Sequence, residues 1–239
     1  MSRHQQQRAP ARSRRPTPRP ASSPMSFGSN ETVQRQMQVS NRIRVQPSQF
    51  ERSGLRAAVL EKGLSAFQKA YVNGDTESMI FTIIDFELSS ADKRLWVINL
   101  ETGALLHHEQ VTHGRNSDRN HDGFVDSAQG LSNRDGSYQS NIGLLRTAET
   151  YHSTKFGGTA MRMDGLESGF NDNARARAIV MHPADYADRQ EGQVLGRSQG
   201  CPALDPDVSG EVIETIKDGT LIFQYYPDPN WLENSNYLN

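Results

Sequence analysis

Two segments in this 239-residue chain, 79–86 and 95–100, are rich in β-branched and aromatic residues and predict a β-sheet. Side chains of this kind pack well on a pleated, half-buried surface. The stretch 89–93 between them is polar and short, so we expect the two segments to pair as a hairpin. Further strand patterns occur at 105–112, 177–181 and 221–226.

Helical patterns lie on either side of these strands. Residues 54–73 carry apolar side chains at helical spacing and stop at Asn73-Gly74, which is typical of a helix end. A second helix is predicted to begin after Asp205, because an Asp N-cap followed by Pro206 satisfies orphan amides and presets the backbone. Few helices among many strands predict a mainly β, α+β fold rather than a doubly wound α/β fold.

Charge is distributed unevenly along the chain. Residues 1–50 hold nine arginines and a single acid, Glu31, a net charge of +8, whereas the whole chain carries −2. Residues 1–45 are also rich in proline and poor in large apolar side chains, so they cannot offset the cost of ordering the backbone, about 1–2 kcal/mol per residue. The sequence predicts a disordered basic tail at 1–45 on an acidic folded body.

The remaining divisions follow from the same patterns: a helix and linker at 46–78, the main domain at 79–228 and a C-terminal tail at 229–239. We expect no membrane span, because no apolar run of about 18 residues occurs. The basic N-terminus is not followed by the apolar core of a Sec signal peptide. A solvated linker or leader is the simplest interpretation of the tail, and no nucleic-acid partner is expected; oligomeric state is not indicated.

The single cysteine, Cys201, cannot form an intramolecular disulfide. A lone cysteine is often an inert buried side chain. Here, however, His182 ends a predicted buried strand, and Cys201 follows 19 residues later, directly after Gly200. A neighbouring imidazole can lower the pKa of a thiol, and glycine permits a sharp turn that points amides at an oxyanion. On spacing alone, the inert and the catalytic interpretations both stay open.

The sequence of this region resembles that of the L,D-transpeptidase (YkuD-like) family, in which a histidine is followed by Ser-x-Gly-Cys. The corresponding residues here are His182 and Ser198-Gln199-Gly200-Cys201. The resemblance extends over roughly 79–226 and is nearest to the murein L,D-transpeptidase catalytic-domain branch. Further matching segments are 82–86, 93–98, 113–117, 131–133, 165–167, 171–175 and 177–182.

The resemblance implies a β-rich sandwich with short flanking helices and a catalytic domain at 79–228. It implies Cys201 as nucleophile and His182 as base, oriented by a backbone carbonyl. It also implies a turn shaped by Ser198 and Gly200, with the amides of Gly200 and Cys201 as oxyanion donors. The implied partners are peptidoglycan stem peptides in the cell envelope, periplasmic or extracytoplasmic. With no Sec signal visible, either the protein begins at another residue, or export uses another route or injection by a secretion apparatus. Catalysis would need no cofactor.

At three positions near the cysteine and the histidine, this sequence differs from the usual family pattern, and these differences affect how a substrate would be bound. Gln199 stands where many relatives have histidine, and Ala203 where many have arginine. Arg197 could supply the missing cation for a substrate carboxylate, so we predict it to bind substrate. Pro183 replaces the glycine that usually follows the base, which leaves only its carbonyl for local bonding.

Three other polar residues in matched segments are candidate substrate-binding residues: His113, Asn173 and Arg175. For each, a structural alternative stays open. His113 could hydrogen-bond residues near 132–133, and the other two could support the loop before the strand of His182.

A calcium-like pattern occupies 118–126. Carboxylate, amide and carbonyl oxygens suit a hard cation, but Gln129 stands where an EF-hand has its bidentate Glu, so the predicted Ca²⁺ site would be weak and structural. An ordinary polar turn is the alternative. The candidate ligands are Asp118, Asn120, Asp122, the carbonyl of Phe124 and Asp126.

The predicted function is therefore peptidyl transfer through a cysteine thioester on stem tetrapeptides, giving cross-links or exchange of D-amino acids. With water as acceptor, the same site would be an L,D-carboxypeptidase, and it would also serve a secreted effector that attacks cell walls. A candidate from another class is a non-catalytic, calcium-dependent wall-binding module that retains the motif.

Overall fold

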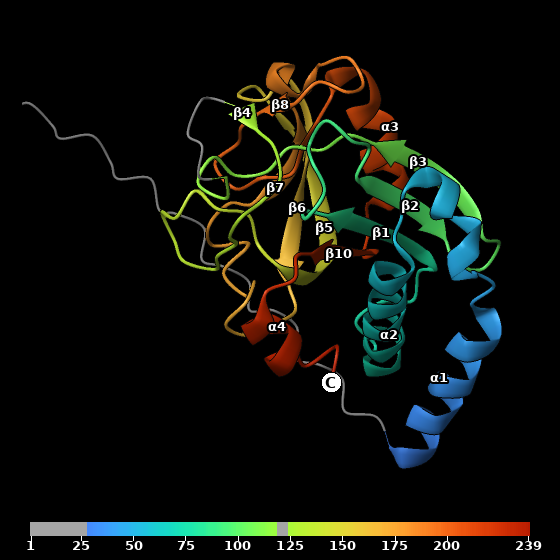
Figure 1. Cartoon of the computed structure of the whole chain (residues 1–239). Helices are drawn as coiled ribbons and strands as arrows, with labels where there is room; N and C mark the ends of the chain where they lie inside the picture. The colour runs from blue at the N-terminus through green and yellow to red at the C-terminus, as the bar shows by residue number, and fades with distance from the viewer. Residues whose placement is uncertain (1–27, 119–123) are drawn as a thin grey trace, which may run out of the picture.

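The computed structural model describes residues 28–118 and 124–239 of the chain (Figure 1). Its main sheet contains eight strands, in the spatial order β3 (Ala104–Glu109), β2 (Leu95–Asn99), β1 (Ile80–Asp85), β10 (Leu221–Tyr225), β5 (Gly143–Ser153), β6 (Gly158–Gly165), β7 (Val180–Pro183) and β9 (Ala203–Leu204). A second sheet pairs β4 (Phe124–Val125) with β8 (Leu195–Gly196). The α-helices are α1 (Ser29–Arg42), α2 (Ala57–Asn73), α3 (Pro206–Ile216) and α4 (Pro229–Asn234), and the 3-10 helices are η1 (Pro47–Gln49), η2 (Glu51–Ser53) and η3 (Asp185–Ala187).

The mainly β, α+β fold predicted from the sequence is confirmed. The strands β1 and β2 form the expected antiparallel hairpin, with Thr82 opposite Val97, and β1 also pairs in parallel with β10. The carboxylate of Asp205 accepts a hydrogen bond from the amide of Asp207 at 2.8 Å, so the predicted N-cap of α3 is present. The strands predicted at 105–112 and 177–181 are shifted by a few residues, to β3 and β7.

Two apolar clusters hold the sheet, one on each face. Successive side chains of a strand point to opposite faces, so Phe81 and Ile83 of β1 join α2 in one cluster. Ile84 joins Val212 and Ile216 of α3 in the other. Full burial of one such side chain contributes about 1.5–3 kcal/mol. Packing against a helix on each face therefore stabilises β1 at the centre of the sheet.

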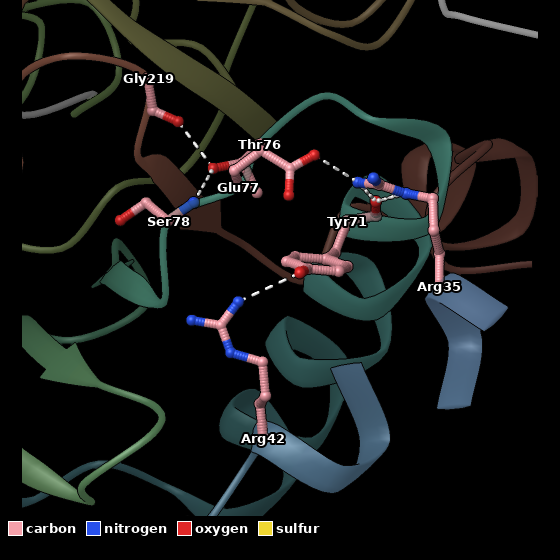
Figure 2. A network of polar contacts seen from close by, with 7 residues as sticks. All are labelled: Arg35, Arg42, Tyr71, Thr76, Glu77, Ser78 and Gly219. Atoms are coloured by element: carbon pink, nitrogen blue, oxygen red, sulfur yellow. Dashed lines mark hydrogen bonds and ion pairs between the residues drawn. The ribbon is translucent and has the colours of Figure 1, made fainter. Parts of the chain in front are cut away.

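The range predicted as a disordered tail, 1–45, contains the helix α1, so the prediction is wrong for residues 29–42. Figure 2 shows why this part of the chain is ordered. Arg35 donates to the carbonyl oxygen of Tyr71 at 3.0 Å and to the carboxylate of Glu77 at 2.7 Å. Arg42 donates to the hydroxyl of Tyr71 at 3.1 Å. Arginines counted only as charge in the sequence therefore fasten α1 to α2; residues 1–27 lie outside the described residues.

The hairpin of β5 and β6 was not predicted, and neither was α4. The ranges involved are long: β5 has 11 residues and β6 has eight. The helix α4 lies in the range predicted as a C-terminal tail, yet Trp231 is fully buried and donates to the carboxylate of Glu167 at 2.9 Å. Within the described residues, no helix combines the length and apolar character that a membrane crossing requires.

Candidate active site

Parallel pairing of two short strands brings His182 and Cys201 to one cavity. His182 lies in β7 opposite Ala203 of β9, and Cys201 precedes β9 by two residues. The cavity has a volume of about 790 Å³, and both side chains line it. The 18 residues between them in sequence thus return the chain to the same end of the sheet.

Cys201 is nearly enclosed, with 8% of its surface exposed. Its Sγ accepts a hydrogen bond from the amide of Val180 at 3.5 Å and lies 3.7 Å from the carbonyl oxygen of Ala178. Burial raises the pKa of the thiol above its ordinary value, although the Val180 amide and the charges of Lys155 and Arg177 oppose the shift. Burial therefore has a larger effect on the thiol pKa than these stabilising groups, which favours the neutral thiol.

His182 is also buried, and its orientation is fixed on one side by the backbone. Its Nδ1 lies 2.7 Å from the carbonyl oxygen of Pro183. Because a carbonyl can only accept, Nδ1 carries the proton and Nε2 is left as the basic nitrogen. Burial lowers the pKa of His182, partly offset by the Pro183 carbonyl, so the ring is neutral and able to accept a proton at neutral pH.

An aromatic ring fixes the other side of the imidazole. Phe156, in the turn between β5 and β6, stacks on His182 with ring centroids 3.7 Å apart and planes 16° apart. Both rings line the cavity, as does the neighbouring Lys155. The unpredicted hairpin thus supplies one wall of the site.

The turn before Cys201 is held by a compact set of hydrogen bonds. The hydroxyl of Ser198 donates to the carbonyl oxygen of Cys201 at 2.6 Å and accepts from the amide of Gly200 at 3.1 Å. The hydroxyl of Ser140 donates to the carbonyl oxygen of Gly200 at 3.0 Å. The predicted oxyanion role therefore does not fit the Gly200 amide, which is already engaged. Within the described chain, no acceptor binds the amide of Cys201, which leaves it as the candidate donor.

Gly200 has a φ of +119°, and a Cβ placed there would lie 2.8 Å from the carbonyl oxygen of Gln139 and 2.9 Å from Cδ1 of Ile179. We expect Gly200→Ala to lower the free energy of unfolding by about 1–2 kcal/mol from backbone strain alone. Displacement of the turn should also reduce turnover at Cys201. Thermal unfolding and product formation measure the two effects.

A matched control for this substitution is Gly210→Ala, because Gly210 lies in α3 with nothing within 4 Å of an added Cβ. That variant should be stabilised by about 1 kcal/mol through helix propensity. Equal melting temperatures for the two variants would show that the turn tolerates a side chain at Gly200.

The structure places only some of the predicted residues at the cavity. Arg197 and Ser198 line it together with the Cys–His pair. His113 does not: it is fully buried, and its Nδ1 accepts from the guanidinium of Arg94 at 2.8 Å. Burial and the charge of Arg94 lower the pKa of His113 well below its ordinary value. Its backbone carbonyl accepts from the amide of Ser198 at 3.1 Å. The geometry favours a structural role, with Arg94 and Ser198 as partners instead of the predicted residues at 132–133.

Asn173 and Arg175 are likewise outside the lining of the cavity. The amide of Asn173 donates to Oδ1 of Asn133 at 3.0 Å. Arg175 pairs with Glu149 at 2.8 Å and with Asp164. Both therefore support the loop before β7, which was the alternative to substrate binding.

Sequence reasoning missed Arg177, which lines the cavity two residues from Arg175. Its guanidinium donates to the carbonyl oxygen of Gln139 at 2.6 Å and to the hydroxyl of Ser137 at 3.1 Å. Arg177 begins the segment 177–182, which matches the family, and this match could have identified it as a candidate site residue. Other lining residues that were missed are Tyr138, Lys155, Phe156 and Tyr186.

The predicted calcium site falls partly on residues outside the described ones, Asn120 and Asp122 among them. Of the candidate ligands, the carboxylate of Asp118 accepts from the amide of Asp126 at 2.9 Å, and the carboxylate of Asp126 accepts from the hydroxyl of Ser89. In residues 28–118 and 124–239, no cluster of His, Cys, Asp or Glu could hold a metal ion. Calcium binding stays a prediction.

The structure is a β-rich domain in which an enclosed cysteine and a carbonyl-oriented histidine line one cavity, and these are the residue types that cysteine nucleophile enzymes use. Comparison with protein families gives the particular class. A model of the L,D-transpeptidase catalytic domain matches residues 51–225, and the chain belongs to this family.

Similar solved structures include an L,D-transpeptidase from Mycobacterium smegmatis, with 13% identity, a TM-score of 0.37 and coverage of 62% of this chain and 59% of that one. A protein from Bdellovibrio bacteriovorus has 14% identity, a TM-score of 0.39 and coverage of 62% and 48%. An L,D-transpeptidase from Stackebrandtia nassauensis has 13% identity, a TM-score of 0.35 and coverage of 89% and 98%. The chain thus spans less than two thirds of the first two. No curated protein matches the sequence.

The shifts in pKa predict how Cys201 reacts with iodoacetamide. Because burial raises the pKa of the thiol, we expect the midpoint of the pH–rate curve to lie above that of a free cysteine thiol measured in the same buffers. Mass spectrometry of the labelled peptide gives the rate. A midpoint below that of the free thiol would indicate a thiolate–imidazolium pair at rest.

Proposed function

We propose that this protein is a peptidoglycan L,D-transpeptidase that uses Cys201 as nucleophile and His182 as general base. The observation that carries the proposal is that both side chains line one cavity. The Pro183 carbonyl engages Nδ1 of His182, so Nε2 is the nitrogen that can accept a proton. Membership of the family supports peptidoglycan as the substrate and an extracytoplasmic site of action.

The first half of the reaction forms a thioester. As Sγ of Cys201 attacks the carbonyl carbon before the terminal D-residue, Nε2 of His182 removes the thiol proton. The oxyanion of the tetrahedral intermediate faces the amide of Cys201. When the intermediate collapses, the C–N bond breaks, His182 returns its proton to the leaving amine, and the acyl group stays on sulfur.

The second half transfers the acyl group to an acceptor amine. The amine attacks the thioester carbonyl, His182 takes the proton that the amine loses, and the C–S bond breaks. The proton then passes from His182 to the departing sulfur, which restores the neutral thiol and imidazole. Water in place of the amine would give L,D-carboxypeptidase activity by the same steps.

The neutral resting pair suits this mechanism. Both groups begin in the protonation state that the first step requires, because burial raises the pKa of Cys201 and lowers that of His182. A charged pair would instead have to be desolvated inside the cavity. The cations Lys155, Arg177 and Arg197 on the lining suit the carboxylates of a stem peptide.

The test is to incubate the purified protein with muropeptides that carry stem tetrapeptides and to identify the products by mass. Cross-linked dimers or products with an exchanged D-residue indicate transpeptidation, and tripeptides indicate hydrolysis. Intact mass of rapidly quenched protein should show one acyl group on Cys201. The proposal fails if neither product nor acyl-protein forms.

A further inference from the structure

A second hollow lies beside the active-site cavity, and the two have lining residues in common. It has a volume of about 390 Å³, and four of its lining residues also line the larger cavity. Neither Cys201 nor His182 contributes to it. The shared residues are Tyr186, Arg197, Ser198 and Gln199. A molecule in this hollow, which we term the arginine groove, would therefore lie next to the turn that carries the thiol without occupying the position of the attacked carbonyl.

The charge of the groove is unbalanced. Three of its seven lining residues are arginines, Arg115, Arg189 and Arg197, and none is an acid. Within the described chain, no ion pair involves any of the three. Residues 51–239, by contrast, carry a net charge of −10, which is the net charge of the chain, −2, minus that of residues 1–50, +8. Uncompensated arginines grouped in an acidic body attract an anion.

Two arginines of the groove have contacts within the protein. The guanidinium carbon of Arg115 lies 3.9 Å from the ring centroid of Tyr138. Arg189 donates to the carbonyl oxygen of Asp188 at 2.8 Å, which uses one of its five N–H donors. Gly196 also lines the groove, and a Cβ added to it would lie 2.6 Å from Cβ of Tyr186, so only a residue without a side chain fits there. Stacked and hydrogen-bonded arginines are partly oriented before a ligand arrives, which lowers the entropic cost of binding it.

We propose that the arginine groove binds the carboxylate of the acceptor amine, so that this site selects amines that carry a free carboxylate. The inference rests on the proposed function and assigns residues to the binding of its acceptor. Guanidinium groups bind carboxylates through paired, charge-assisted hydrogen bonds. The carboxylate in the groove would place the amine of the same molecule toward the thioester at Cys201, across the shared turn.

Acceptor selection gives the kinetic test. With a tetrapeptide donor, D-methionine and D-methioninamide are compared as acceptors, and the exchanged product is measured by mass. We expect the KM for D-methionine to be at least tenfold lower than that for the amide, since a hydrogen bond to a charged group contributes about 1.5–3 kcal/mol. Arg189→Gln and Arg115→Gln should each raise the KM for D-methionine about tenfold and leave the KM for the amide unchanged.

The matched control is Arg52→Gln, which removes an exposed arginine outside the groove and should change neither KM. Arg189 is exposed, so its substitution does not threaten folding. If the thioester forms but the two acceptors react with equal KM, the acceptor inference is overturned and the proposed function stands.

A binding measurement on Cys201→Ala protein separates the groove from the chemistry. Titration with D-methionine should shift the guanidinium N–H resonances of the groove arginines, and titration with D-methioninamide should not. Arg189→Gln should weaken the effect about tenfold. Absence of a shift, or equal shifts with both ligands, overturns the inference whether or not the protein turns over muropeptides.

Discussion

Replacing Cys201 by alanine should abolish turnover of stem tetrapeptides. The chain has a single cysteine, so no other thiol can form the acyl intermediate. Removing the nucleophile from residues that act as a unit lowers kcat by a factor on the order of 10⁴–10⁶. The measurement is the rate of product formation from tetrapeptide muropeptides, followed by mass.

The fold of Cys201→Ala should persist, so the loss can be assigned to chemistry. The side chain contributes one sulfur beyond Cβ, and burying an atom of this size contributes about 1 kcal/mol. Thermal unfolding of the variant should therefore remain cooperative with a slightly lower midpoint. Cys201→Ser is the companion variant: it keeps the shape but offers a much weaker nucleophile, and it should be nearly as inactive. Turnover retained in either variant, in protein free of wild-type enzyme, would rule out a Cys201 thioester.

The elements that can be predicted from sequence are those whose pattern is local. The hairpin of β1 and β2 follows from its β-branched residues, and the caps at Gly74 and Asp205 mark the ends of their helices. The hairpin of β5 and β6 cannot be predicted in this way, because much of the second half of β5 is exposed. There the residues of β5 alternate poorly between buried and exposed, so no clear period of two is present.

The helix α1 escapes for a different reason. Its order depends on partners far away in sequence: Arg35 and Tyr71 are hydrogen-bonded and lie 36 positions apart. Composition measures the apolar surface that a segment can bury by itself, and α1 buries only Val39. Tertiary hydrogen bonds to another helix cannot be inferred from that quantity.

The candidate site divides in the same way. The motif gives Cys201 and His182, because their spacing and the glycine turn are written in one short segment. It does not give their protonation states, because these depend on burial by other elements and on charges from Lys155 and Arg177. Nor does it give the stacking of Phe156 on His182, since the two residues meet only when the β5–β6 turn closes over β7.

Replacing His182 by glutamine should lower kcat by about 10²–10⁴-fold, the usual contribution of a positioned general base. Glutamine retains a polar side chain of similar volume but cannot accept a proton at neutral pH. The wild-type rate should have a broad plateau in pH. On the acid side it falls when His182 becomes protonated, and burial moves this limb below the ordinary histidine pKa. On the alkaline side it falls when Cys201 ionises before the reaction, because His182 then has no proton to return to the leaving amine; burial moves this limb above the ordinary thiol pKa.

The acid limb distinguishes a base from a structural residue. In His182→Gln it should disappear, leaving a low rate that no longer depends on a group of histidine pKa. The matched control is His152→Gln: His152 is an exposed residue of β5 that lies outside the lining of the cavity, so its substitution should leave kcat and both limbs unchanged. An acid limb that persists at the same pH in His182→Gln would show that another group takes the proton from Cys201 and that His182 only supports the wall of the cavity.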